Sequence, residues 1–169
     1  MEIEEKKDET IGGVKIEYFE NYFGKRKDYF IPKLIALENG KKYSFNYGAF
    51  FFGIFWVLYR RLYVHSLIIF LIVMIESMIE MWLLDYYRYD RDLEISMRVI
   101  WLLIYGIVLG YLGNYFYLKS SKKKIEQISL SQEEESFKMR KLKKLGSGNW
   151  ILVLSFLLIV ILFVAFGQK

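Results

Sequence analysis

The chain has 169 residues, of which 54% are apolar and 25% are charged, and its mean hydropathy is positive. The two classes are sorted into separate blocks along the sequence, which indicates that a bilayer solvates some blocks and water the others. The absence of cysteine excludes disulfides and thiolate metal sites. In such a chain, a net charge of +5 points to basic segments that flank membrane spans rather than to nucleic acid.

The first forty-four residues are polar. Residues 1–13 are charged and end in two glycines, so we predict a disordered tail. Residues 14–44 carry an excess of lysine and arginine. A first short helix is indicated by a helical apolar face made by Tyr18, Phe19, Tyr22 and Phe23, and a second short helix fits 29–38. We predict that 14–44 is a basic amphipathic cytoplasmic region at a membrane surface.

Residues 45–59 are apolar and aromatic, but they are too few for a span, which needs about 20 residues. Arg60 and Arg61 follow directly. We therefore predict a re-entrant or interfacial aromatic helix over 45–61, and the sequence leaves open whether it dips into the bilayer or lies on its surface.

Longer apolar stretches follow, and the expected fold class is all-α. The pattern predicts a polytopic membrane protein with three transmembrane helices, at 62–84, 98–118 and 149–166. The first two form a hairpin over 62–118, joined by a short polar loop at 85–97. A basic cytoplasmic segment at 119–148 separates the hairpin from the third span.

Loop charges predict the orientation of these spans. The 85–98 segment has a balance of −1, whereas the 119–144 segment has a balance of +5. Basic loops stay in the cytoplasm, so we expect the N-terminus inside and the C-terminus outside a bacterial cytoplasmic (inner) membrane. If 45–59 crossed as a fourth span, the basic segment would move outside.

The run from Phe45 to Tyr63, FNYGAFFFGIFWVLYRRLY, is long and unusual in composition. It resembles the F-N-W-A-A-F-F-F-G-P-x-W-x-x-Y-R-K box of a family of small bacterial membrane proteins classed only as a domain of unknown function. The resemblance covers roughly residues 15–125. Tyr47 stands where the family usually has Trp, and Ile54 where it often has Pro. The resemblance implies a membrane location and no established activity.

Six residues of this box are candidates for lipid or partner contact: Phe50, Phe51, Trp56, Tyr59, Arg60 and Arg61. The simpler interpretation is a membrane-interface anchor, because aromatic rings favour that depth and arginines reach for phosphates. The sharper one is a wedge that binds a lipid headgroup or a peptide, with the two arginines as the anion site.

Glu76 and Glu80 lie four residues apart, on one face of the first predicted span. One hypothesis is a polar end to the span, paired with Arg98 or Arg88. The other is an ion site, for a cation or a proton, between protomers, because acids inside a membrane often mark functional sites. Two carboxylates without histidine make a poor transition-metal site, and the single histidine, His65, has no catalytic partner in the pattern.

Three glycines of the second predicted span, Gly106, Gly110 and Gly113, share a face that allows close helix approach. Asn114 lies beside them and could hydrogen-bond across the contact. The sequence leaves open whether this packing face meets another span of the same chain or a second protomer.

The sequence therefore favours a non-enzymatic membrane protein that acts as an interaction, scaffold or regulatory subunit, without a cofactor. Its expected partners are anionic lipids of the bilayer and a homo-oligomer or membrane protein partner, and not nucleic acid. The alternative function is a small oligomeric ion channel or transporter that uses Glu76 and Glu80.

Overall fold

The computed structural model describes residues 10–87 and 91–166, and they are almost entirely helical. A minimal hairpin, β1 (Thr10–Ile11) and β2 (Val14–Lys15), precedes the helices. The helices are α1 (Ile16–Phe23), the 3₁₀ turn η2 (Gly24–Arg26), α2 (Lys27–Glu38), α3 (Tyr47–Tyr59), α4 (Tyr63–Tyr87), α5 (Arg91–Ser129), α6 (Glu135–Gly146) and α7 (Trp150–Phe166).

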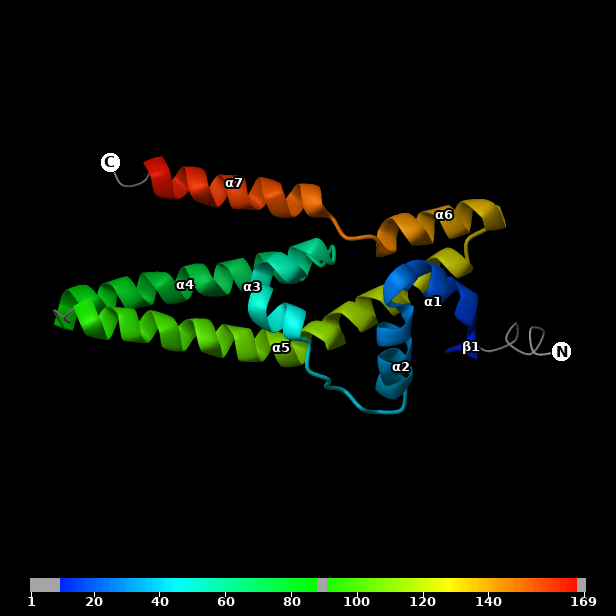
Figure 1. Cartoon of the computed structure of the whole chain (residues 1–169), viewed down its shortest axis with the longest axis horizontal. Helices are drawn as coiled ribbons and strands as arrows, with labels where there is room; N and C mark the ends of the chain where they lie inside the picture. Colours follow the sequence, from blue (N-terminus) through cyan, green and yellow to red (C-terminus); the bar gives the residue numbers. More distant parts are fainter. Residues whose placement is uncertain (1–9, 88–90, 167–169) are drawn as a thin grey trace.

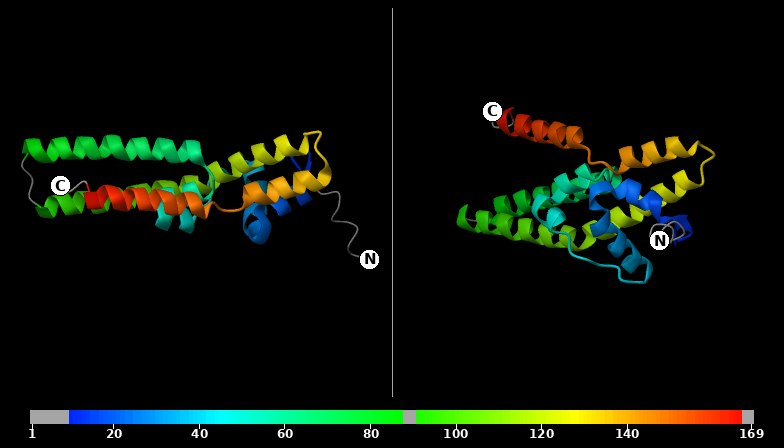
Figure 2. Two further views of the ribbon diagram at one scale, coloured as in Figure 1. Left: turned by 90° about the horizontal axis from the view of Figure 1, so that it is seen from above. Right: turned by 45° about the vertical axis from the view of Figure 1, so that its right-hand side comes forward.

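Among the described residues, three helices are long and apolar enough to cross a membrane, as the sequence predicts. They fall in Tyr63–Tyr87, Asp92–Ser129 and Glu135–Leu162, and α7 is the apolar part of the third. In Figure 1, α4, α7 and the first half of α5 extend to one end of the molecule, and Figure 2 shows the same arrangement from two other sides. We call these three segments the arm.

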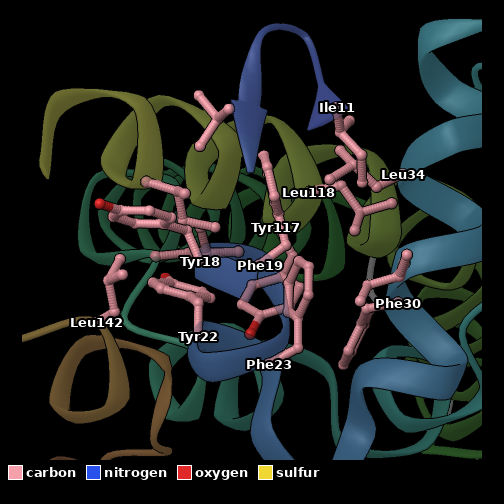
Figure 3. Packing of buried hydrophobic residues seen from close by; sticks show 14 of the residues in the cluster. Ile11, Tyr18, Phe19, Tyr22, Phe23, Phe30, Leu34, Tyr117, Leu118 and Leu142 are labelled. Carbon is pink, nitrogen blue, oxygen red and sulfur yellow. The ribbon is translucent and has the colours of Figure 1, made fainter. Parts of the chain in front are cut away.

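The other end of the molecule is a compact group of α1, α2, α6 and the second half of α5, here called the head (Figure 1). Its core is built from the apolar face predicted over 18–23, which packs against the second half of α5 and against α6. Figure 3 shows these side chains. The fully buried members include Phe19, Phe30, Leu34, Tyr117, Leu118, Ile125 and Leu142.

This core changes the interpretation of residues 14–44. We expected their apolar face to lie on a membrane, but the structure buries all four of its aromatic rings inside the head. The elements that cover them are α6, α2 and the continuation of α5 beyond the predicted span 98–118, and the sequence suggested only a polar segment for α6 and for this part of α5. A packed protein partner removes apolar surface from water as effectively as lipid does.

Other element bounds also differ from the prediction. The expected tail 1–13 ends in an ordered turn, because Thr10–Ile11 pairs with Val14–Lys15, whereas residues 1–9 lie outside the described part. The loop expected at 85–97 is largely helical, since α4 runs to Tyr87 and α5 starts at Arg91. Alternating acidic and basic side chains in this stretch are compatible with helix.

The arm is loosely covered compared with the head. The apolar window of α4 contains no buried residue, and only 6% of the window in the third segment is buried. Apolar side chains on the outside of the arm, such as Leu71, Ile75 and Leu158, are about half exposed or more. Such faces need lipid or another protein around them.

Candidate functional site

Helix α3 lies between the head-side ends of α4, α5 and α7, and it contacts all three (Figure 1). It begins at Asn46, whose side-chain oxygen accepts a hydrogen bond from the Ala49 backbone N–H at 2.9 Å. Gly53 interrupts the helix with φ 50° and ψ −128°, a conformation that is strained for any residue with a Cβ. The α3 helix is therefore two short segments that meet at a kink.

The first half of α3 packs on the glycine face of α5. A Cβ at Gly113 would lie 2.7 Å from the Ala49 Cβ, and one at Gly106 would lie 3.1 Å from the Phe50 carbonyl oxygen. A Cβ at Gly110 would lie 2.6 Å from the Phe45 ring. The sequence led us to expect another span or a second protomer at this face, and the structure places α3 there instead.

Asn114 completes this contact, which we call the α3–α5 joint. Asn46 donates a side-chain hydrogen bond to the Asn114 side-chain oxygen at 2.7 Å, and its backbone N–H donates to the Gly110 carbonyl at 2.7 Å. The Asn114 amide donates to the Ser44 hydroxyl at 2.9 Å and lies 3.3 Å from the Tyr29 hydroxyl. Both asparagines are buried, so the network fixes the start of α3 against α5.

The second half of α3 is attached to α7. The Tyr59 carbonyl accepts a hydrogen bond from the Asn149 backbone N–H at 2.9 Å, and the Tyr59 ring lies 4.9 Å from the Trp150 ring. Phe55 and Phe156 meet edge to face with centroids 5.8 Å apart. The start and the end of α3 are thus each bound to the head-side end of an arm helix.

Arg60 points inward, in contrast to the exposed anion site that the sequence suggested. It is 6% exposed, and its guanidinium lies 4.8 to 5.7 Å from the ring centres of an aromatic cage made by Phe30, Trp56, Tyr59 and Tyr117. Its Nη1 donates to the Tyr117 hydroxyl at 3.4 Å, while Nε and Nη2 have no hydrogen-bond partner within the described residues. Burial lowers the pKa of Arg60 from its ordinary value, and nearby Arg26 adds to this effect.

The remaining box residues divide between surface and interior. Phe51 is 72% exposed, consistent with a residue that contacts lipid or a partner, whereas Trp56 is buried beside the joint. Arg61 has a positive φ of 56°, and its Nε donates to the Ser147 carbonyl at 3.0 Å. The two arginines therefore point to different surroundings and do not form one anion site.

Glu76 and Glu80 line a cavity of about 580 Å³ between α4 and α5, with Arg98, Trp101 and Tyr105 among the other lining residues. One oxygen of each carboxylate is buried without a hydrogen-bond partner within the described residues. Arg98 lines the same cavity but pairs with Glu94 at 2.6 Å, so the expected pairing with these acids is not formed. Arg88 lies outside the described residues.

The remaining candidates are the single histidine and possible metal-binding groups. His65 lies over the Phe116 ring with centroids 4.6 Å apart. Within the described ranges, no group of three or more His, Asp or Glu side chains is arranged to hold a metal ion. Sequence reasoning did not identify Tyr29, Ser44 and Tyr117 as joint and cage residues, since their partners lie 57 to 85 residues away in the chain.

Comparison with known families now gives the chain a classification. The family model described as "Protein of unknown function (DUF2628)" matches residues 4–123, which is more than half of the chain. The chain belongs to this family. The resemblance to an uncharacterised family, noted from the aromatic box, is thereby confirmed. No curated protein and no solved structure matches the chain.

The DUF2628 match contains all of the α3–α5 joint and the Arg60 cage. It begins before the β1–β2 hairpin and ends within α5, so α6 and α7 lie outside it. In this chain, the head therefore consists of part of the DUF2628 segment together with α6. The second half of α3 is attached to α7, which lies outside the family match.

Proposed function

We propose that this DUF2628 protein is a non-enzymatic, multi-pass membrane protein that acts as an interaction, scaffold or regulatory subunit. In this proposal the head lies in the cytoplasm and the arm crosses the bacterial cytoplasmic membrane. The α3 helix enters the inner leaflet and returns, and the C-terminus lies outside. The basic balance of 119–144 and the attachment of both α3 ends to the head side of the arm support this arrangement.

The observation that carries the proposal is the contrast between the joint and the arm. The joint is tightly packed and hydrogen-bonded, whereas the outer faces of α4 and α7 are apolar and uncovered. Inside a bilayer, helices associate through packing and not through the hydrophobic effect, so such faces are free to meet helices of another protein. A head with a buried core, joined to helices whose outer faces are uncovered, suits a subunit that attaches to others.

Photo-crosslinking in native membranes tests this role. A photoreactive amino acid is placed at Leu71 on α4 or Leu158 on α7, both about half exposed, and at Leu130 in the head as a control that is 85% exposed. We expect discrete protein adducts from at least one arm position that are absent from Leu130. Adducts with lipid alone from both arm positions would contradict the interaction role.

The cavity beside Glu76 and Glu80 favours a second candidate, an oligomeric ion channel or transporter, because both carboxylates face it. Removing both charges as Glu76→Gln with Glu80→Gln keeps the shape of the side chains. If the second candidate is right, the wild-type protein conducts ions in liposomes and the double variant does not. We expect no carboxylate-dependent flux from the wild-type protein, and its detection would replace the interaction role with transport.

A further inference from the structure

A groove between α3 and α7 opens beside the aromatic cage. It has a volume of about 360 Å³, within the range of small-molecule sites. Its walls are apolar and mostly aromatic, with Phe52, Phe55 and Trp56 from α3 and Trp150, Val153 and Leu157 from α7. Among the described residues that line it, Arg26 is the one charged side chain, so the groove is apolar along its length and cationic at one end.

That cationic end continues into a second cavity of about 430 Å³ at the surface of the head. The two cavities share Arg26 and Gly48, so they adjoin. Lys25 and Asp28 also line the second cavity, which leaves two cations against one carboxylate. Both Lys25 and Arg26 are exposed, and within the described residues neither forms an ion pair.

The buried Arg60 adds positive charge behind the groove wall. Its guanidinium lies 5.7 Å from the Trp56 ring centre and 5.4 Å from that of Tyr59, and both rings line the groove. Two of its nitrogens are unpartnered, and no carboxylate pairs with it within the described ranges. A buried cation without an anion is costly, so this region favours a negative group at the mouth of the groove.

We propose that this groove binds one anionic phospholipid of the inner leaflet, with an acyl chain between α3 and α7 and the phosphate at Arg26 and Lys25. The charge complementarity selects this occupant, because the long apolar part ends at a cluster of excess positive charge. A purely apolar peptide would leave the cations unused, and a free phosphate would leave the apolar walls uncovered. The inference rests on the membrane placement proposed above and does not require the interaction role.

The test uses the full chain with Trp82→Phe and Trp101→Phe, so that fluorescence comes from Trp56 and Trp150, which both line the groove. The protein is reconstituted in phosphatidylcholine vesicles that contain increasing fractions of brominated phosphatidylglycerol or, in a parallel series, of brominated phosphatidylcholine. Bromine quenches tryptophan at short range. We expect half-maximal quenching at a clearly lower fraction of the brominated phosphatidylglycerol.

Two pairs of variants locate the effect. Arg26→Gln should raise the phosphatidylglycerol fraction needed for half-quenching roughly fivefold, the factor expected for one basic side chain at an anionic surface. Arg140→Gln removes an exposed arginine of α6 and should leave that fraction unchanged. Leu157→Phe should fill the groove and reduce quenching by both lipids, whereas its neighbour Leu158→Phe, which does not line the groove, should not.

The possible results separate the alternatives. Equal quenching by both lipids in the parent protein would overturn the anionic-lipid site and leave the membrane placement intact. No quenching by either lipid would overturn the placement as well. Loss of the preference on adding inorganic phosphate would assign the cations to a free anion. Quenching that falls as protein density in the vesicle rises would assign the groove to a second protein copy, and either result would overturn the proposal.

Discussion

Arg60 shows how one residue can reverse the role that its type suggests. Its guanidinium is always charged at physiological pH, and here four aromatic rings replace the water around it. This arrangement fixes Trp56 and Tyr59 against the head through Phe30 and Tyr117. Arg60 therefore positions the aromatic box on the head and is not available as a surface anchor.

Asn114 should be a stability determinant of the α3–α5 joint. Asn114→Ala removes the partner of the buried Asn46 amide and leaves it unsatisfied, which should lower the free energy of unfolding by about 1–3 kcal/mol. Denaturant unfolding in mild detergent measures this change. Asn39→Ala, at the exposed end of α2, is the matched control, and an equal loss for both variants would argue against the network.

The pH dependence of stability should depend on Tyr22. Burial raises the pKa of Tyr22 to about 12, against 10.0 when it is exposed. The folded state thus favours the neutral phenol, and its contribution is complete below pH 10 and lost as the pH rises towards 12. The full loss is about 2–3 kcal/mol for this group.

Unfolding measured between pH 9 and 12 tests this expectation. Stability should fall across the upper part of this range in the wild-type protein and fall less in Tyr22→Phe. Tyr43→Phe, which changes an exposed tyrosine, serves as the control. The same alkaline loss in all three proteins would show that burial of Tyr22 is not its source.

At the scale of elements, α3 and α5 depend on each other. Gly53 breaks the helical geometry of α3, and irregular backbone of this kind is tolerated at membrane depth only where protein surrounds it. The glycine face of α5 lets the first half of α3 approach closely, and this brings the Leu109 side chain of α5 to 3.9 Å from where a Cβ at Gly53 would lie. Small residues that resemble an oligomer motif are thus used inside one chain.

Gly110→Leu should displace α3 from α5. Even a Cβ at Gly110 would lie 2.6 Å from the Phe45 ring, so a leucine must push the ring and the start of α3 away, at a cost of about 1–3 kcal/mol. Thermal unfolding and size in mild detergent report the damage. Val108→Leu, on an exposed face of α5, should be neutral.

The damage caused by Gly110→Leu can also be compared with the effect of removing the Glu76 and Glu80 charges. We expect Gly110→Leu to damage the protein more than Glu76→Gln with Glu80→Gln, because the first disturbs packing and the second keeps shape and hydrogen bonding. If the double glutamine variant were the more damaged protein, the two carboxylates would contribute more to stability than their position beside an open cavity indicates.

At the scale of the whole molecule, the proposed orientation can be mapped with single cysteines, since the chain has none of its own. Tyr86→Cys should react with an impermeant reagent added outside intact cells, and Leu130→Cys should not, although both side chains are exposed. Tyr43→Cys and Tyr63→Cys flank α3 and should both be protected if it returns to its own side.

Permeabilised cells supply the control for this map, because all four cysteines should then react. Labelling of Leu130→Cys in intact cells would invert the orientation. Labelling of Tyr63→Cys but not Tyr43→Cys would mean that α3 crosses the membrane. These results are distinct, so the orientation and the path of α3 are tested separately.

The sequence by itself determined the helical class, the three membrane-capable helices and the break before the first of them. Hydropathy over about 20 residues is a local property, and a bilayer imposes the same length on every span. The sequence also predicted membership of an uncharacterised family, and the family match over residues 4–123 confirms it.

Only the tertiary structure decided which faces these helices use. The aromatic face of α1 could have covered lipid and the glycines of α5 another span, and both patterns fit either partner. The choice depended on residues far apart in the chain: Arg60 meets Tyr117 and Asn114 meets Tyr29 only after α5 has folded back beside α2 and α3. Local periodicity predicts that a face will be buried, but its partner is set by packing between distant segments.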